Sequence, residues 1–301
     1  MIRIKPSFYD HFSCLASACR HSCCVGWEID IDEWSIEKYA AIEGELGQEL
    51  KHAIALEPEA HFILDAHERC PFLREDGLCR LYLALGESAL CEICTLHPRF
   101  FNRFPGREEA GLGLCCEETV RLLLDTSEPF HMIEEDDGVQ EETDPWIEGL
   151  ASLRSELFAI LLDTALSFRS RLNIALRRMD TARPAFRAEE WKRFFLSLER
   201  MDENWSNALG VLDSVREEEL SSEMEDPRYA KILCYLLYRH FITADSEEEA
   251  RRIFRFCVIA TMLIAALGTA MPGETHEHLR AFSAEIEYSD ENVEKICWEF
   301  P

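Results

Sequence analysis

Cysteine is unusually frequent in the first part of this sequence. The chain has 301 residues and 13 cysteines, and ten of these lie within the first 116 residues. No apolar run follows the two cations of residues 1–6, so we expect no secretory leader and a cytoplasmic, reducing location. Structural disulfides are rare there, and dense thiols in such a location indicate metal or redox chemistry.

The N-terminal cysteines form three clusters. They are Cys14-x4-Cys19-x3-Cys23-Cys24, Cys70-x8-Cys79-x11-Cys91-x2-Cys94 and the adjacent pair Cys115-Cys116. Short loops between cysteines let two sulfurs face one centre, as zinc and iron–sulfur sites require. A turn at Asp76-Gly77 would bring Cys70 and Cys79 near each other. The sequence therefore predicts a region that folds around a thiolate-bound centre.

These spacings leave the metal open between zinc and an iron–sulfur cluster. The gaps are irregular and the thiols exceed what one zinc ion uses, which makes Cys91 and Cys115 dispensable candidates. The radical-type motif Cys-x3-Cys-x2-Cys is absent, because Gly26 stands at its third position. Arg99 follows the second cluster and is a candidate for binding an anionic group such as a carboxylate, or for supporting the loop.

Strong negative charge narrows the classes of partner. Lys and Arg number 31 against 58 Asp and Glu, a formal net charge of −27. Such a surface repels phosphate backbones and anionic headgroups, so we expect neither nucleic-acid nor membrane binding. It favours a basic partner, although solubility alone also explains the charge.

Composition divides the chain into three parts. Residues 1–127 are the Cys-rich, metal-binding region, residues 128–147 form an acidic linker, and residues 148–301 read as helices. Asp32 is a predicted N-cap, and the apolar run 256–271 is predicted to be a buried helix because it is too short to span a membrane. Within residues 148–301 no alternation is long enough to predict a sheet, and Phe62-Ile63-Leu64 is a strand candidate in the first region. The predicted fold is mostly α, with a Cys-rich irregular and helical region around a metal centre, packed on a C-terminal helical bundle.

An ordered set of motifs lies in residues 7–125. The motifs are Cys14-x4-Cys19-x3-Cys23-Cys24-x-Gly26-Trp27, Cys70-Pro71-Phe72-Leu73-x5-Cys79, Leu85-Gly86-Glu87-x2-Leu90-x3-Cys94-x2-His97-Pro98-Arg99 and Leu112-x-Leu114-x-Cys116-x-Glu118. The set resembles the flagellin lysine-N-methylase (FliB-type) family. The C-terminal half resembles the family only in length and helical character. His97 and Cys115 depart from the family pattern, which more often has an aromatic residue and a serine at these positions.

The resemblance implies an enzyme that methylates lysine ε-amines on flagellin, with S-adenosylmethionine as donor and a [4Fe-4S] cluster. The implied metal ligands are Cys14, Cys19, Cys23, Cys24, Cys70, Cys79, Cys94 and Cys116. These eight thiols exceed the four that one cubane uses, and which four bind stays open. No base or donor motif is evident; Glu118, Glu28 and Tyr82 are candidates for the base that methyl transfer to an amine requires.

Two other functions remain open from the sequence. One is a non-enzymatic module whose thiolates hold zinc for folding or metal storage, and the other is an iron–sulfur electron-transfer protein. Metal content and methyl transfer distinguish them from a methyltransferase.

Overall fold

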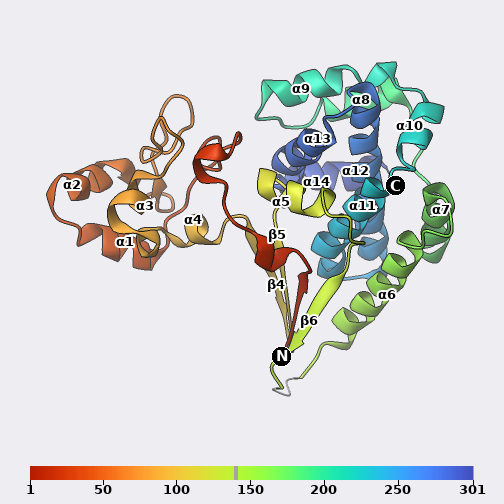
Figure 1. Ribbon diagram of the computed structural model, residues 1–301, viewed down its shortest axis with the longest axis horizontal. Helices are drawn as coiled ribbons and strands as arrows, with labels where there is room; N and C mark the ends of the chain where they lie inside the picture. Colours follow the sequence, from red (N-terminus) through yellow and green to blue (C-terminus); the bar gives the residue numbers. More distant parts are fainter. Residues whose placement is uncertain (139–141, 301) are drawn as a thin grey trace. The chain divides into compact units, whose positions relative to one another are not determined.

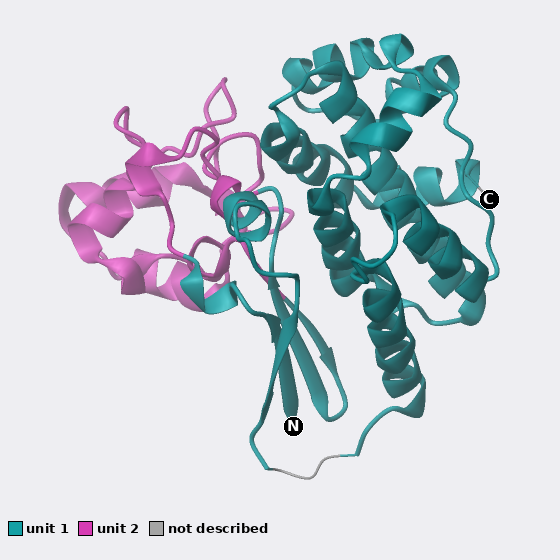
Figure 2. Ribbon diagram, turned by 45° about the vertical axis from the view of Figure 1, so that its right-hand side comes forward, with its two compact units in different colours: residues 1–12, 101–115, 119–301 teal, residues 13–100, 116–118 magenta. Residues whose placement is uncertain are grey.

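The structure is a computed structural model that describes residues 1–138 and 142–300. The described chain is mostly α-helical, as the sequence predicts. It divides into two compact units, shown in Figure 2. Unit 1 comprises Met1–Phe12, Phe101–Cys115 and Thr119–Pro301, and unit 2 comprises Ser13–Phe100 and Cys116–Glu118.

Unit 2 is built from short elements around a small core. Its elements are α1 (Glu33–Ala40), α2 (Gly44–Ala53), β2 (Ile54–Ala55), β3 (His61–Phe62), α3 (Arg80–Leu85) and α4 (Glu92–Leu96). Asp32 caps α1 as predicted, its carboxylate accepting the Ser35 N–H at 2.9 Å. Tyr39, Phe62 and Phe72 form the aromatic part of the core.

Unit 1 contains a sheet that the sequence did not predict. Its strands are β4 (Arg99–Phe104, which begins in unit 2), β5 (Arg107–Leu112), β1 (Ile2–Pro6) and β6 (Met132–Asp136), in that order. β1 pairs with β5 in parallel and with β6 in antiparallel orientation. Figure 1 shows these strands beside the helices that follow them in the chain.

β5 was not predicted as a strand because it contains charged residues. Every residue of β5 is buried, including Arg107, Glu108 and Glu109. Their charges are compensated: Glu109 pairs with Arg107 and with Arg154. A buried strand normally reads as an apolar run, so a strand whose polar groups are paired by distant residues escapes a periodicity argument.

The helices of unit 1 surround one long, buried helix. α12 packs against α10, α11, α13 and α14. The helices are α5 (Glu117–Leu124, which begins in unit 2), α6 (Pro145–Leu161), α7 (Phe168–Arg178), α8 (Ala188–Phe195), α9 (Glu203–Gly210), α10 (Glu217–Glu223), α11 (Pro227–His240), α12 (Glu247–Ala270), α13 (Thr275–Phe282) and α14 (Asp290–Glu299). Among the described residues, α12 is the helix long and apolar enough to cross a membrane, and 78% of its most apolar window is buried within the protein. The predicted buried helix is therefore confirmed.

Tyrosines of α11 attach the sheet to the helices of unit 1. The Tyr238 hydroxyl donates to the carbonyls of Ile4 and Ala110, at 2.9 and 2.8 Å. The Tyr235 hydroxyl lies 2.8 Å from the Leu112 N–H, from which it accepts a hydrogen bond. The sheet and the helices thus share one core within unit 1.

The boundaries of the two compact units differ from those of the three predicted regions, because the units are defined by packing and the regions by composition. Residues 1–12 and 101–115, from the Cys-rich stretch, pack with the helical residues of unit 1. Within the predicted linker, Met132–Asp136 form β6, and α6 begins at Pro145. Residues 139–141 of that linker lie outside the described residues.

Candidate metal centre

All eight cysteines predicted as metal ligands belong to unit 2. Cys116 joins it although it lies sixteen positions beyond Phe100, where the main stretch of the unit ends. All the cysteines are free thiols. Cys14 and Cys23 are exposed, Cys70 is buried, and the other five are half-buried. The fold therefore gathers thiols from separate stretches of the chain into one compact unit.

The first thiol group consists of Cys14, Cys19, Cys23 and Cys116. Burial is the largest cause that raises the pKa of Cys19, and interactions with Cys116 and Cys14 add to it. A hydrogen bond with Cys24 is the largest cause that raises the pKa of Cys23, and Cys14 and Cys116 add to it. Cys14 and Cys116 thus interact electrostatically with both Cys19 and Cys23, so we treat the four thiols as one group.

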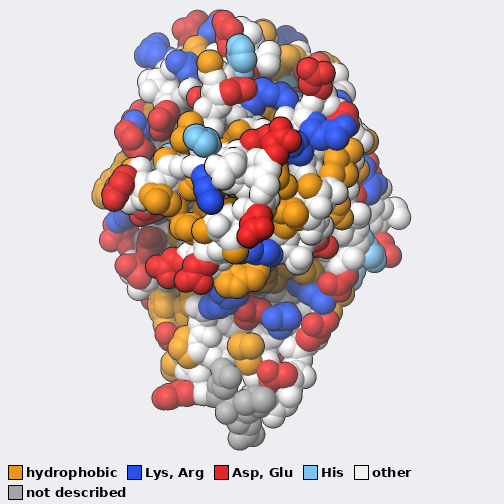
Figure 3. Space-filling model, turned by 90° about the vertical axis from the view of Figure 1, so that its left-hand side faces the viewer, with side chains coloured by type: hydrophobic (Ala, Val, Ile, Leu, Met, Phe, Trp, Pro, Cys, Tyr) orange, Lys and Arg blue, Asp and Glu red, His pale blue; other side chains and the backbone are white. Residues whose placement is uncertain are grey.

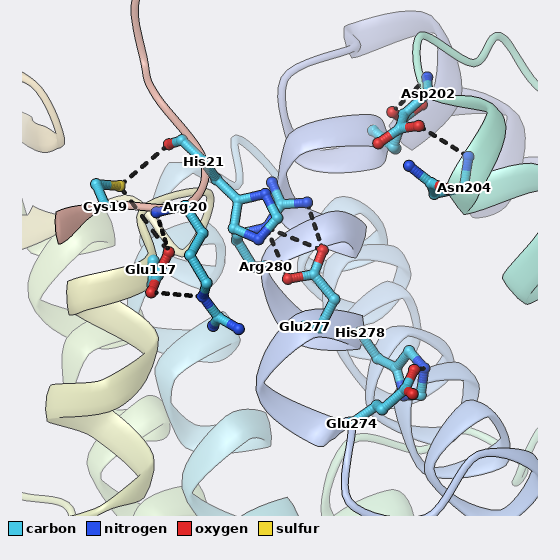
Figure 4. Close-up of polar contacts among 11 residues, drawn as sticks. Cys19, Arg20, His21, Glu117, Asp202, Asn204, Glu274, Glu277, His278 and Arg280 are labelled. Carbon is cyan, nitrogen blue, oxygen red and sulfur yellow. Dashed lines mark hydrogen bonds and ion pairs between the residues drawn. The ribbon is translucent and has the colours of Figure 1, made fainter. Parts of the chain in front are cut away.

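Glu117 connects the two chain segments of the first thiol group, as Figure 4 shows. Its carboxylate accepts the Arg20 backbone N–H at 3.0 Å and forms an ion pair with the Arg20 guanidinium at 3.0 Å. The Cys19 thiol donates to the His21 carbonyl at 3.3 Å and lies 3.9 Å from Glu117 Oε2. Glu117 thus fixes the position of Cys116 relative to the loop that carries Cys19.

The second thiol group consists of Cys24, Cys70, Cys79, Cys91 and Cys94. All five pack in or against the core of unit 2. The Cys70 N–H donates to the Cys24 carbonyl at 2.8 Å. The turn predicted at Asp76-Gly77 is present, with Gly77 at φ +77°, and it places Leu73 and Cys79 in an antiparallel bridge. The first and second clusters of the sequence therefore meet through backbone hydrogen bonds.

Thiols in unit 2 also approach one another in pairs. A hydrogen bond with Cys23 is the largest cause that lowers the pKa of Cys24, to about 7, and it raises the pKa of Cys23. A hydrogen bond with Cys94 likewise lowers the pKa of Cys91 and raises that of Cys94. In each pair one thiol therefore has a lowered pKa, which favours the thiolate form that ligates a metal.

Cys91 is a thiol that the sequence reasoning set aside and that the structure places beside Cys94. It is fully buried, it precedes α4 as the N-cap residue, and Cys94 is one turn further along the same helix. Burial, followed by Cys91 and Cys94, raises the pKa of Tyr39. The Cys91-x2-Cys94 spacing was the available signal, because positions three apart share one helix face.

The thiols of unit 2 are the type of ligand that a soft metal or an iron–sulfur cluster requires. Among residues 1–138 and 142–300, however, no three His, Cys, Asp or Glu side chains are placed to hold one metal ion. The thiols form pairs and neighbourhoods without converging on a common point. The metal centre and its individual ligands therefore stay a prediction.

The other candidate residues occupy varied positions. Arg99 begins β4, two residues after His97, whose ring packs edge-on against Trp27 with ring centroids 6.2 Å apart. Among the candidate bases, Glu118 is 4% exposed, whereas Tyr82 is 49% exposed. The Glu28 carboxylate lies 3.6 Å from His61 Nδ1. Of the two carboxylates among these candidate bases, Glu118 is the buried one.

Comparison with known proteins supplies three similar sequences. The chain is 36% identical over 129 residues to the lysine-N-methylases of Salmonella choleraesuis and Salmonella typhimurium, a match covering 40% of this chain and 32% of each relative. It is 33% identical over 129 residues to the flagellar biosynthetic protein FliU of Salmonella muenchen, covering 40% of this chain and 76% of that relative. The match therefore spans about a third of the length of the lysine-N-methylases.

Other comparisons yield no match. No family model matches the chain. No solved structure matches it either.

Proposed function

This chain belongs to the FliB-type flagellin lysine-N-methylase family, and we propose that it methylates lysine ε-amines on flagellin with S-adenosylmethionine as donor. The observation that carries the proposal is the gathering in unit 2 of the eight thiols that the family motifs match. Two relatives are named for the activity and a third for flagellar biosynthesis. The high negative charge of the chain also suits a lysine-bearing partner.

The thiols of unit 2 are proposed to hold a [4Fe-4S] cluster. The pairing of Cys23 with Cys24 and of Cys91 with Cys94 supports this role, because each pair offers one thiol of lowered pKa. When bound, the cluster supplies iron that can exchange electrons or coordinate a ligand. The protein's contribution is to bring together thiols from three stretches of sequence and to bury part of them.

Methyl transfer places a further demand on the site. The lysine amine must be neutral to form the new N–C bond as the S–CH3 bond of the donor breaks. The products are S-adenosylhomocysteine and the methylated amine, and one proton leaves the nitrogen. A carboxylate such as Glu118 is the proposed acceptor of that proton.

Two measurements on the full chain test this function. Protein purified without oxygen is expected to be brown and to contain about four iron and four sulfide per chain, the content of one cubane. Incubation with methyl-labelled S-adenosylmethionine and flagellin is expected to place label on lysine. Flagellin whose lysines have been acetylated is the control, because its amines are blocked.

The outcomes separate the competing functions. Colourless protein with stoichiometric zinc and no label transfer would identify a zinc-binding module. A cluster without label transfer would favour electron transfer. Label on lysine in protein free of iron would support the methyltransferase and overturn the cluster.

A further inference from the structure

Unit 2 also contains a groove whose lining residues include no cysteine. Its volume is about 370 Å³, and it lies between the start of α1 and the segment that carries α4. The lining residues are Asp32, Trp34, Leu90, Glu92, Thr95 and Leu96. Two carboxylates, one indole and two leucine side chains therefore face the same space.

Asp32 holds the two sides of this groove together. Its carboxylate accepts the Ser35 N–H and hydroxyl, each at 2.9 Å, and the Glu92 N–H at 2.8 Å. Burial acts to raise the pKa of Asp32, but these hydrogen bonds outweigh it and lower the pKa. One carboxylate thus joins the N-termini of α1 and α4, so the groove is part of the folded framework.

Trp34 gives the groove an aromatic wall that already attracts a cation. The indole is 62% exposed. The Lys38 ammonium lies 4.5 Å from the ring centroid. An indole face attracts ammonium groups through its quadrupole. A lysine of a partner protein can make the same interaction in place of Lys38.

Glu92 adds negative charge to the groove. Its side chain is exposed. Leu90 and Leu96 line the groove beside it and offer an apolar surface to a methylene chain. An apolar stem with a cationic tip is the shape of a lysine side chain.

The same short helix carries groove residues and thiols. Glu92, Thr95 and Leu96 lie on α4 with Cys94, and the Cys91 carbonyl accepts the Thr95 hydroxyl at 3.1 Å. The surrounding surface is partly apolar: Ile93 is 44% exposed. Figure 3 shows hydrophobic side chains intermingled with acidic and basic ones on one face of the molecule. A groove next to the thiols is thus suited to a partner segment.

We propose that the groove formed by Asp32, Trp34 and Glu92 binds a lysine side chain of the protein that this enzyme methylates. The inference rests on the proposed function and names where the substrate protein is recognised. Two carboxylates stabilise the ammonium form, whereas methyl transfer needs the neutral amine. The groove therefore recognises a lysine of the partner and does not activate it.

Kinetics with flagellin as substrate test this role. Trp34→Ala and Glu92→Gln are each expected to raise the KM for flagellin by about tenfold, with kcat nearly unchanged. The KM of the wild-type enzyme should also rise with salt more steeply than that of Glu92→Gln, because the variant lacks one attractive charge. Iron and sulfide content, measured on the same preparations, is expected to stay constant.

The chain supplies matched controls. Trp298 is also 62% exposed and has a cation, Arg252, 4.7 Å from its ring centroid, but it lies on α14 in unit 1. Glu45 lies in the first turn of α2 as Glu92 lies in that of α4. Trp298→Ala and Glu45→Gln are expected to leave KM unchanged.

Failure of this inference is distinguishable from failure of the proposed function. If the wild-type protein transfers no methyl group, the proposed function fails. If the wild type is active and Trp34→Ala and Glu92→Gln keep its KM, the groove is not the recognition site. A fall in kcat with unchanged KM would also overturn the inference, because the groove would then act in the reaction.

Discussion

Arg154 on α6 donates two hydrogen bonds to Glu109 on β5, from Nη2 to Oε1 at 2.6 Å and from Nη1 to Oε2 at 2.7 Å. Both side chains are buried, and Arg154 Nη1 also donates to the Tyr238 carbonyl at 3.1 Å. This pair joins the sheet of unit 1 to two of its helices.

Replacing Arg154 by methionine is expected to lower the free energy of unfolding by about 3–5 kcal/mol, because Glu109 would lose one of its two buried cationic partners. Urea unfolding followed by circular dichroism measures the change. Arg178→Met is the control: Arg178 pairs with Glu156 at 2.7 Å on the surface, so its loss is expected to cost at most about 1 kcal/mol. Equal effects of the two variants would contradict the role given to the buried pair.

Gly47→Ala in α2 is expected to destabilise the protein by about 1–3 kcal/mol. A Cβ at this position would lie 1.9 Å from the Ile42 carbonyl oxygen, a backbone atom that cannot move away alone. Gly149 in α6 has open space around it, so Gly149→Ala is expected to stabilise by up to about 1 kcal/mol through helix propensity. Thermal unfolding of both variants measures these opposite signs, and a neutral Gly47→Ala would contradict the close approach.

Glu287 makes stability depend on acidity. Burial acts to raise its pKa, but Arg239 and the hydrogen bond with His240, at 2.7 Å, outweigh it and lower the pKa to about 2. A depressed pKa stabilises the folded state above the ordinary value of 4.5, and that contribution is lost as the pH falls toward 2. The expected loss is about 3 kcal/mol, from the pKa difference.

Glu287→Gln removes this dependence, so its free energy of unfolding should change less between pH 5 and pH 2 than that of the wild type. Burial raises the pKa of Glu285, the neighbouring buried carboxylate, so its contribution is present at low pH and is lost as the pH rises. Glu285→Gln should therefore make the acid side of the profile steeper. A flattened profile in Glu285→Gln and not in Glu287→Gln would reverse the assignment.

Cys79→Ser and Cys116→Ser are each expected to reduce bound iron and sulfide to less than about a tenth of the wild-type content, because oxygen replaces a soft thiolate ligand. Cys257 is fully buried in α12 of unit 1, so Cys257→Ala should keep the cluster and lose only packing energy. Iron and sulfide analysis after anaerobic purification compares them. Full iron content in Cys79→Ser and Cys116→Ser would exclude both thiols as ligands.

Local signals in the sequence predicted much of the helical structure. Asp32 caps α1 as predicted, and the same kind of local signal is present where Ser246 caps α12 and Pro227 begins α11. Cys234 and Cys257 are fully buried, as their positions on apolar helix faces indicate. Such features act over one or two turns of chain, so the residues themselves carry the information.

The arrangement of strands was not predictable in this way. β1 pairs with β5, about a hundred residues away, and β6 is composed largely of acidic residues. Likewise, Trp34 and Glu92 line one groove only because the Asp32 carboxylate reaches the Glu92 N–H across sixty residues of sequence. The residue pattern around Trp34 does not predict contact with the segment around Glu92, and the reverse also holds.

The amino-acid order was sufficient to identify the thiol-rich region, its family and its helices, because spacing, capping and periodicity are short-range properties. Folding in three dimensions decided that Cys116 joins Cys19 through Glu117 and that Glu109 is buried against Arg154. It also decided that the exposed indole of Trp34 and the carboxylate-bearing Glu92 line one groove. A buried charged group is stable only when an oppositely charged or hydrogen-bonding group lies beside it, because water is excluded there. In these contacts the partner comes from a segment distant in the chain.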